Sequence, residues 1–378
     1  MNVERLHRIL LDIQQELTKT NQATLIQQIE THLQNQINQP QQPTHQTNFV
    51  KALENLYKAL ENSKYNGFSP SWKQVIDEIT ADDLLGNPLK TKLEQILSQN
   101  TITPAKALED IKAINAEFKL FQTAVTNTLA GFKELGIEEE ELEPGECELG
   151  YTIPREFIDN KLSSFKKEVS ELTFILNHIS EAVEGEKQEY KIKTISSSDF
   201  LLYVVIGLQV ADVLSKATER ILNHYKQILE IKVLRNQLSE KGVPIAKTKG
   251  VDTYANGMME TEIKKIAKEV LEEHYNNGDT ARKNELENGV VFALNKLANR
   301  IDNGFNVEIR VEPLPKPKKE DEISETQQAQ IDLVTSIQKS SSNIEFIETS
   351  GESILELPEK KKNSQQLTMA IVNTGFGA

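Results

Sequence analysis

The sequence predicts a mainly α-helical protein with two helical units and a disordered C-terminal tail, the second unit being a bundle of long helices with a small two-stranded β patch. Apolar residues recur at steps of three and four over most of residues 1–312, which is the spacing of one helical face. An acidic stretch with Pro and Gly, residues 138–146, interrupts this pattern and indicates a boundary between the units.

The composition limits the classes of function. With 378 residues and about 100–200 residues per domain, two folded units are expected. The net charge of −14 and the scattered Lys and Arg residues offer no basic face, so neither nucleic acid nor an anionic membrane surface is an expected partner. The longest apolar run, Phe200–Ile206, is far shorter than the ~20 residues that span a bilayer. One cysteine cannot form an internal disulfide and Met1–Thr20 lacks a signal-peptide pattern, so we expect a cytoplasmic location.

The first unit is predicted to open with amphipathic helices over residues 1–33. Residues 34–48 are rich in Gln and Asn and contain two prolines, a composition typical of a linker. A helical domain is predicted over residues 49–135. Within it, Ser69-Pro70 and Thr103-Pro104 each combine a helix-capping residue with a proline at the first helical position.

The second unit is predicted over residues 154–312, after an acidic linker at residues 136–153. Its apolar spacing predicts four helices. These cover residues 155–184, 199–241, 258–275 and about 280–301. Two short patterns, Tyr190–Ile195 and Val307–Val311, are typical of strands. We hypothesise that these two strands pair with each other and close the bundle.

The helix predicted over residues 199–241 carries a heptad-like seam, in which apolar residues alternate steps of four and three. The apolar members of this interaction seam are Val210, Leu214, Ala217, Ile221, Ile228, Ile231 and Leu238. Burial of one Leu or Ile of such a seam stabilises the association by about 1.5–3 kcal/mol. The seam therefore predicts helix-to-helix association, within the chain or with a protein partner or second copy.

The tail, residues 313–378, begins with three prolines and is rich in Ser, Gln, Glu and Lys, so we expect it to be disordered. Two parts are more apolar than the rest. Ile344, Phe346, Ile347, Ile354, Leu355 and Leu357 are candidates to dock as short strands. The C-terminal tip, Leu367–Phe376, is a candidate docking peptide for a partner.

No cofactor or metal is expected. The single Cys and the six His residues show no zinc-ligand spacing, and the sequence has no glycine-rich phosphate loop or dinucleotide fingerprint. Cys147 lies between Glu146 and Glu148, whose negative charges raise the pKa of a thiol and weaken it as a nucleophile.

One pair of residues suggests a catalytic alternative. Arg220-x-x-x-His224 resembles the Arg and His pair that HEPN-type helical ribonucleases carry on one helix, with three intervening residues here where the family usually has four to six. The resemblance implies RNA cleavage at a dimer cleft, with Arg220 and His224 as candidate catalytic residues. The heptad seam offers a second explanation of His224, as a packing position.

The favoured function is therefore a non-catalytic helical interaction or scaffold protein that acts through coiled-coil-like helix association. The first alternative is a helical effector or nuclease-like toxin that uses Arg220 and His224. The second is a regulatory subunit of a multi-gene bacterial system such as phage defence, with which the Gln/Asn-rich segment and single Cys are compatible.

Overall fold

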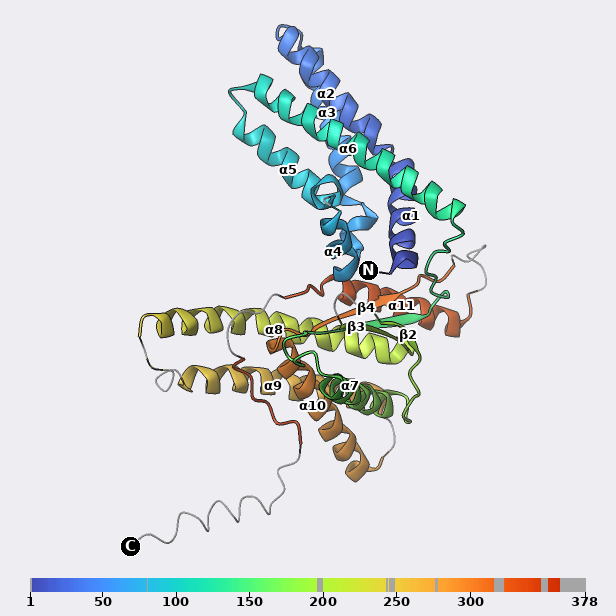
Figure 1. Ribbon diagram of the computed structural model, residues 1–378, viewed down its shortest axis with the longest axis vertical. Coiled ribbons are helices and arrows are strands. Elements are labelled where there is room, and N and C mark those ends of the chain that lie inside the picture. Colours follow the sequence, from blue (N-terminus) through green and yellow to red (C-terminus); the bar gives the residue numbers. More distant parts are fainter. Residues whose placement is uncertain are drawn as a thin grey trace. The chain divides into compact units, whose positions relative to one another are not determined.

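The chain forms two compact units, residues 1–143 and residues 144–378 (Figure 1). The computed structural model describes residues 2–79, 81–195, 200–242, 244, 249–275, 278–315, 323–347 and 353–360. The predicted fold class is confirmed, because most of the described residues lie in helices and the strands form one small sheet. None of the helices in these ranges has the length and apolarity needed to cross a membrane.

The first unit consists of helices that share one apolar core. They are α1 (Val3–Thr20), α2 (Gln22–Asn38), α3 (Pro43–Glu61), η1 (Lys64–Gly67), α4 (Pro70–Glu78), η2 (Asp82–Leu84), α5 (Gly86–Gln99) and α6 (Pro104–Glu134). The predicted helix starts at Pro70 and Pro104 are confirmed. Trp72 is buried in this core, where its ring meets the edge of Phe68.

The prediction of a linker over residues 34–48 is wrong for most of that range. Helix α2 continues to Asn38, and α3 begins at Pro43, so only residues 39–42 connect them. Gln is a good helix former, and Pro at the first helical position loses no hydrogen bond. Because α2 and α3 pack side by side, the predicted parts 1–33 and 49–135 belong to one unit (Figure 1).

Within the described residues, the second unit packs five helices with a four-stranded antiparallel sheet of order β2-β3-β1-β4. The strands are β1 (Cys147–Ile153), β2 (Ile192–Ile195), β3 (Phe200–Ile206) and β4 (Asn306–Val311). The helices are α7 (Leu162–Val183), α8 (Leu208–Glu240), α9 (Lys249–His274), α10 (Thr280–Asp302) and α11 (Glu325–Ser342).

The predicted pairing of the two strand patterns is wrong. Strand β2 pairs with β3, and β4 pairs with β1. The two missed strands were assigned to the acidic linker 136–153 and to the start of the helix over 199–241. A short continuous apolar run such as Phe200–Ile206 does not distinguish strand from helix by periodicity, whereas its aromatic and β-branched content favours a strand.

Two predicted helix starts also differ. Helix α7 begins at Leu162, not near residue 155, because the chain first turns through Asp159 and Asn160 at positive φ. Helix α9 begins at Lys249, nine residues before the predicted Met258. Both differences concern helix ends, where apolar spacing carries little information. Residue 199, where the helix over residues 199–241 was predicted to begin, lies outside the described residues.

The prediction that residues 313–378 are disordered is wrong for residues 325–342 and 353–360. Helix α11 opens with a capping box between Ser324 and Gln327 and packs on α8 and β4. Its buried stripe is narrow, so the average composition of the tail hides it. The apolar residues Ile344, Ile354, Leu355 and Leu357 are buried as expected, although in extended chain without strand pairing. The tip Leu367–Phe376 lies outside the described residues.

Docking of α11 is tested by Ile337→Ala. Ile337 is 0% exposed, so its truncation should lower the free energy of unfolding of the second unit by about 2–5 kcal/mol. Urea unfolding followed by circular dichroism measures this change. Gln338→Ala, at an exposed position of the same helix, is the control and should change stability by less than about 0.5 kcal/mol. Equal effects of the two substitutions would show that α11 is not packed.

Candidate functional site

A short piece of the tail packs against helices α9 and α10 of the second unit. This C-terminal segment, Ser353–Lys360, contains neither helix nor strand and runs past α9 and α10, in red in Figure 1. We call the surface that holds it the peptide groove. Its polar residues are Asn256 of α9 and Asn295, Lys296, Asn299, Arg300 and Asp302 of α10.

Asparagine side chains of the groove bind the main chain of the segment. The amide of Asn256 donates to the carbonyl oxygen of Ile354 at 2.9 Å and accepts from the N–H of Glu356 at 2.7 Å. The amide of Asn299 donates to the carbonyl and accepts from the N–H of Leu357, both at 3.0 Å. A carboxamide presents a donor and an acceptor side by side, which matches the alternating groups of an extended backbone. These contacts therefore recognise an extended chain through its backbone.

The carboxylate of Asp302 binds the start of the segment. Its Oδ2 accepts from the N–H groups of Ile354 at 2.6 Å and Leu355 at 2.7 Å. Its Oδ1 accepts from the hydroxyl of Tyr225 at 2.7 Å and from Nζ of Lys232 at 3.1 Å. Lys232 and Asp302 have side chains only 1% and 0% exposed, so each charge depends on the other in a region shielded from solvent.

The ion pair of Asp302 and Lys232 lies at the C-terminal end of α10, and this position explains why Asp302 needs a cation beside it. Asp302 is the last residue of α10, where a negative charge is unfavourable for the helix dipole. The positive charge of Lys232 offsets both the carboxylate of Asp302 and the negative end of the helix dipole, because its Nζ also lies 3.3 Å from the main-chain oxygen of Asp302. Burial, followed by the charge of Asp302, raises the pKa of Tyr225, so its hydroxyl stays a hydrogen-bond donor.

The far end of the segment is held by charge. The carboxylate of Glu359 accepts from Nζ of Lys296 at 3.1 Å, from Asn299 at 2.9 Å and from Arg300 at 3.3 Å. Burial raises the pKa of Glu359, but the hydrogen bonds from Asn299 and Lys296 and the positive charges of Arg300 and Lys296 outweigh it. The net effect is a lowered pKa, so Glu359 is bound as the anion.

Helix α7 fixes the two cations of the groove. Glu168 lies 2.8 Å from Nε of Arg300, and Glu171 lies 2.6 Å from Nζ of Lys296. Both cationic side chains are almost fully buried. They are therefore held in place at the point where Glu359 binds.

The apolar positions of the segment complete its docking. Ile354, Leu355 and Leu357 are buried in the core of the second unit, whereas Glu356 and Pro358 are exposed. Pro358 has no N–H, and its carbonyl accepts from Asn295 at 2.7 Å. The segment thus presents apolar residues and one carboxylate to the groove, and the side chains of Ser353, Glu356, Pro358 and Lys360 to solvent.

The structure brings the candidate catalytic residues together on α8. Arg220 pairs with Glu262, at 2.7 Å from Nε, and with Glu269, while Nε2 of His224 lies 3.4 Å from Glu262. The side chains of Arg220 and His224 are 30% and 32% exposed, so His224 is not a fully buried seam position. The carboxylates of α9 already neutralise Arg220, which makes this cluster an electrostatic link between α8 and α9.

Most of the predicted interaction seam lies inside the second unit. Val210, Leu214, Ala217, Ile221 and Ile228 are buried in its core. Ile231 is half-buried, and Leu238 is 43% exposed near the end of α8. The first five residues therefore serve packing within the chain.

Other sites offer less chemistry. Burial, with a smaller contribution from Glu146, raises the pKa of the Cys147 thiol to about 12, so this thiol is a poor nucleophile. The described residues contain no group of three or more His, Cys, Asp or Glu side chains placed to hold a metal ion.

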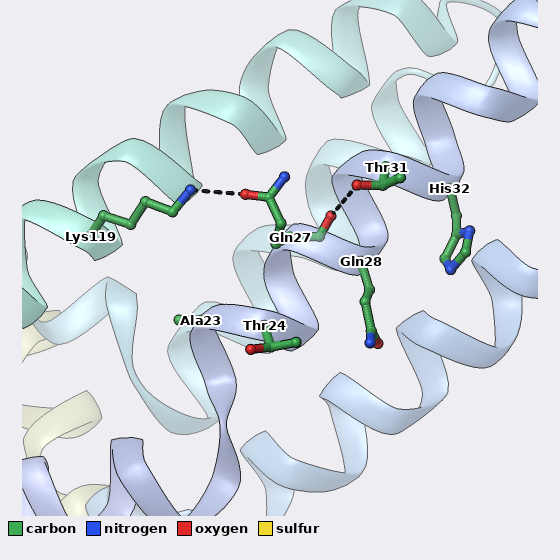
Figure 2. Close-up of a pocket in the computed structure, with 7 residues that line it drawn as sticks. All are labelled: Ala23, Thr24, Gln27, Gln28, Thr31, His32 and Lys119. Carbon is green, nitrogen blue, oxygen red and sulfur yellow. Dashed lines mark hydrogen bonds between the residues drawn. The ribbon is translucent and has the colours of Figure 1, made fainter.

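Figure 2 shows a surface pocket of the first unit, lined by α2 and by Lys119 of α6. Nζ of Lys119 donates to Oε1 of Gln27 at 2.8 Å. The hydroxyl of Thr31 donates to the main-chain oxygen of Gln27, also at 2.8 Å. These groups serve contacts within the unit, so we assign no chemistry to the pocket.

Sequence reasoning missed the groove residues. Asn295, Asn299 and Asp302 follow the spacing i, i+4, i+7 and so share one face of α10. A polar helical stripe is normally solvent-exposed, and nothing in the sequence distinguishes it from a groove. The sequence feature that could have indicated a groove is in the segment, where the apolar residues Ile354, Leu355 and Leu357 interrupt a polar tail.

Comparisons with known proteins give no relative. No protein-family model matches the sequence, and no curated protein or solved structure is significantly similar to it.

The buried ion pair is tested by Lys232→Met. This substitution leaves the buried carboxyl group of Asp302 without its cation, which should lower the free energy of unfolding by about 3–5 kcal/mol. Lys226→Met is the control, because Lys226 lies on the same helix and pairs with Glu345 at the surface. That change should amount to at most about 1 kcal/mol in urea unfolding. A stability loss for Lys232→Met no larger than the control's would contradict the assigned role.

Glu359→Gln should remove a pH-dependent part of the stability. Because the pKa of Glu359 is lowered in the folded protein, its contribution is complete above the usual value of 4.5 and is lost as the pH falls through the lowered value. The unfolding free energies of wild type and Glu359→Gln, measured by urea titration, should therefore differ most at neutral pH and converge in acid. Glu356→Gln, at an exposed position, is the control. A difference that does not change with pH would exclude an ionised Glu359 in the groove.

Proposed function

We propose that this protein is a non-catalytic interaction or scaffold protein whose peptide groove binds an extended peptide. The observation that carries the proposal is the pairing of Asn256 and Asn299 with both donor and acceptor groups of an extended main chain. In extended-peptide recognition, main-chain hydrogen bonds supply affinity and side-chain pockets supply specificity. The groove contains both elements.

The groove is a better candidate than the heptad seam. Five of the seven seam residues are buried in the second unit, so they are not available to a partner helix. The segment, in contrast, is held through side-chain contacts. The main chain of residues 354–358 forms hydrogen bonds to side chains of α9 and α10. A peptide of another chain can make the same contacts.

Two earlier hypotheses relate to this proposal differently. A regulatory subunit of a multi-gene bacterial system is a special case of it, since such a subunit also acts by binding partners. A cytoplasmic location remains part of the proposal. A nuclease that uses Arg220 and His224 is not proposed, because Glu262 and Glu269 occupy the guanidinium that would bind phosphate.

The proposal is tested with a fluorescent peptide of residues 353–360. The full chain should carry Leu355→Ser and Leu357→Ser, which release its own segment from the groove. Saturable binding by fluorescence anisotropy is expected. Adding Asn299→Ala should weaken binding about tenfold or more, since each lost buried hydrogen bond costs about 1–3 kcal/mol.

Asn288→Ala is the matched control for Asn299→Ala. Asn288 lies on the same helix and is exposed, and its amide donates to the main-chain oxygen of Asn284. It should leave peptide binding unchanged. The proposal is rejected if the released chain does not bind the peptide, or if Asn288→Ala and Asn299→Ala have equal effects.

A further inference from the structure

The side chains of the segment define what the groove selects. Ile354, Leu355 and Leu357 are buried, and Glu359 binds Lys296 and Arg300. The intervening positions, Glu356 and Pro358, are exposed and make no demand on the side chain. The groove therefore matches the pattern apolar, apolar, any, apolar, any, acidic.

Charge sets the last position of this pattern. The two cations of the groove are almost fully buried, and Glu168 and Glu171 hold them from the opposite side. A cationic residue in place of Glu359 would face Lys296 and Arg300 with little water to screen the repulsion. A carboxylate is thus favoured there, and Lys or Arg is rejected.

The segment occupies the groove from a short tether. Only five residues separate Ser353 from Ile347, whose N–H is anchored on Asn306 at 3.0 Å. A ligand on a short linker has an effective concentration of about millimolar order, far above that of most protein partners. The segment therefore competes strongly with any peptide in solution.

We propose that the groove binds, on a partner protein, an extended peptide of the pattern apolar, apolar, any, apolar, any, acidic, and that the C-terminal segment Ser353–Lys360 blocks this site until it is displaced. The proposal rests on the function proposed above. It adds the class of ligand and the competitor that regulates access.

The test compares two full-length chains, unsubstituted and with Leu355→Ser and Leu357→Ser, for binding of the fluorescent peptide of residues 353–360. The unsubstituted chain should bind at least about tenfold more weakly, because its groove is filled. A second peptide with Lys in place of Glu359 should bind the released chain at least about tenfold more weakly than the first. Light scattering establishes the oligomeric state of both chains.

Each result has one meaning. Equal affinity of both chains overturns the competition while the proposed function stands, and equal affinity of both peptides overturns the selection of an acid. A failure of the released chain to bind either peptide rejects the proposed function itself. A dimer of the unsubstituted chain that becomes a monomer in the released chain identifies the occupant as the segment of a second copy and overturns the partner peptide.

Discussion

The buried carboxylate of Asp302 is the interaction on which the second unit most depends. It joins three parts of the chain: Tyr225 and Lys232 of α8, the end of α10, and the main chain of Ile354 and Leu355. A buried charge is tolerated only when a counter-charge and enough donors surround it. Asp302 has its counter-charge in Lys232, and its donors are the hydroxyl of Tyr225 and the main chain of the C-terminal segment.

Helix α10 serves two roles because it has two different faces. Its apolar face, with residues such as Val290 and Leu294, packs in the core of the unit. Its second face carries Asn299 and Asp302, which hold the segment through the backbone. These contacts with the backbone are the reason that we propose this surface as a site for a peptide from another protein. The core and the candidate site are therefore built on one helix.

Much of the helical architecture was predictable, since apolar spacing reports burial directly. The starts at Pro70 and Pro104 and the internal seam of α8 follow from local patterns. The linker at residues 34–48 and the strand at Phe200–Ile206 were not predictable in the same way. For residues 34–48, the prediction gave more weight to the Gln/Asn-rich composition than to the helix propensity of Gln. For Phe200–Ile206, a short apolar run fitted a helix and a strand equally well.

Local sequence patterns were enough to predict the helical class, the acidic boundary that includes residue 143, and the apolar positions of the tail. These properties depend on neighbours along the chain. Two features follow from the three-dimensional fold alone: β1 pairs with β3 and β4, and Asn299 and Asp302 contact the main chain of the C-terminal segment. The reason is physical: these hydrogen bonds join groups far apart in the sequence, 52 residues for Asp302 and Ile354 and 58 for Asn299 and Leu357, and no local pattern encodes which distant backbone meets a polar side chain.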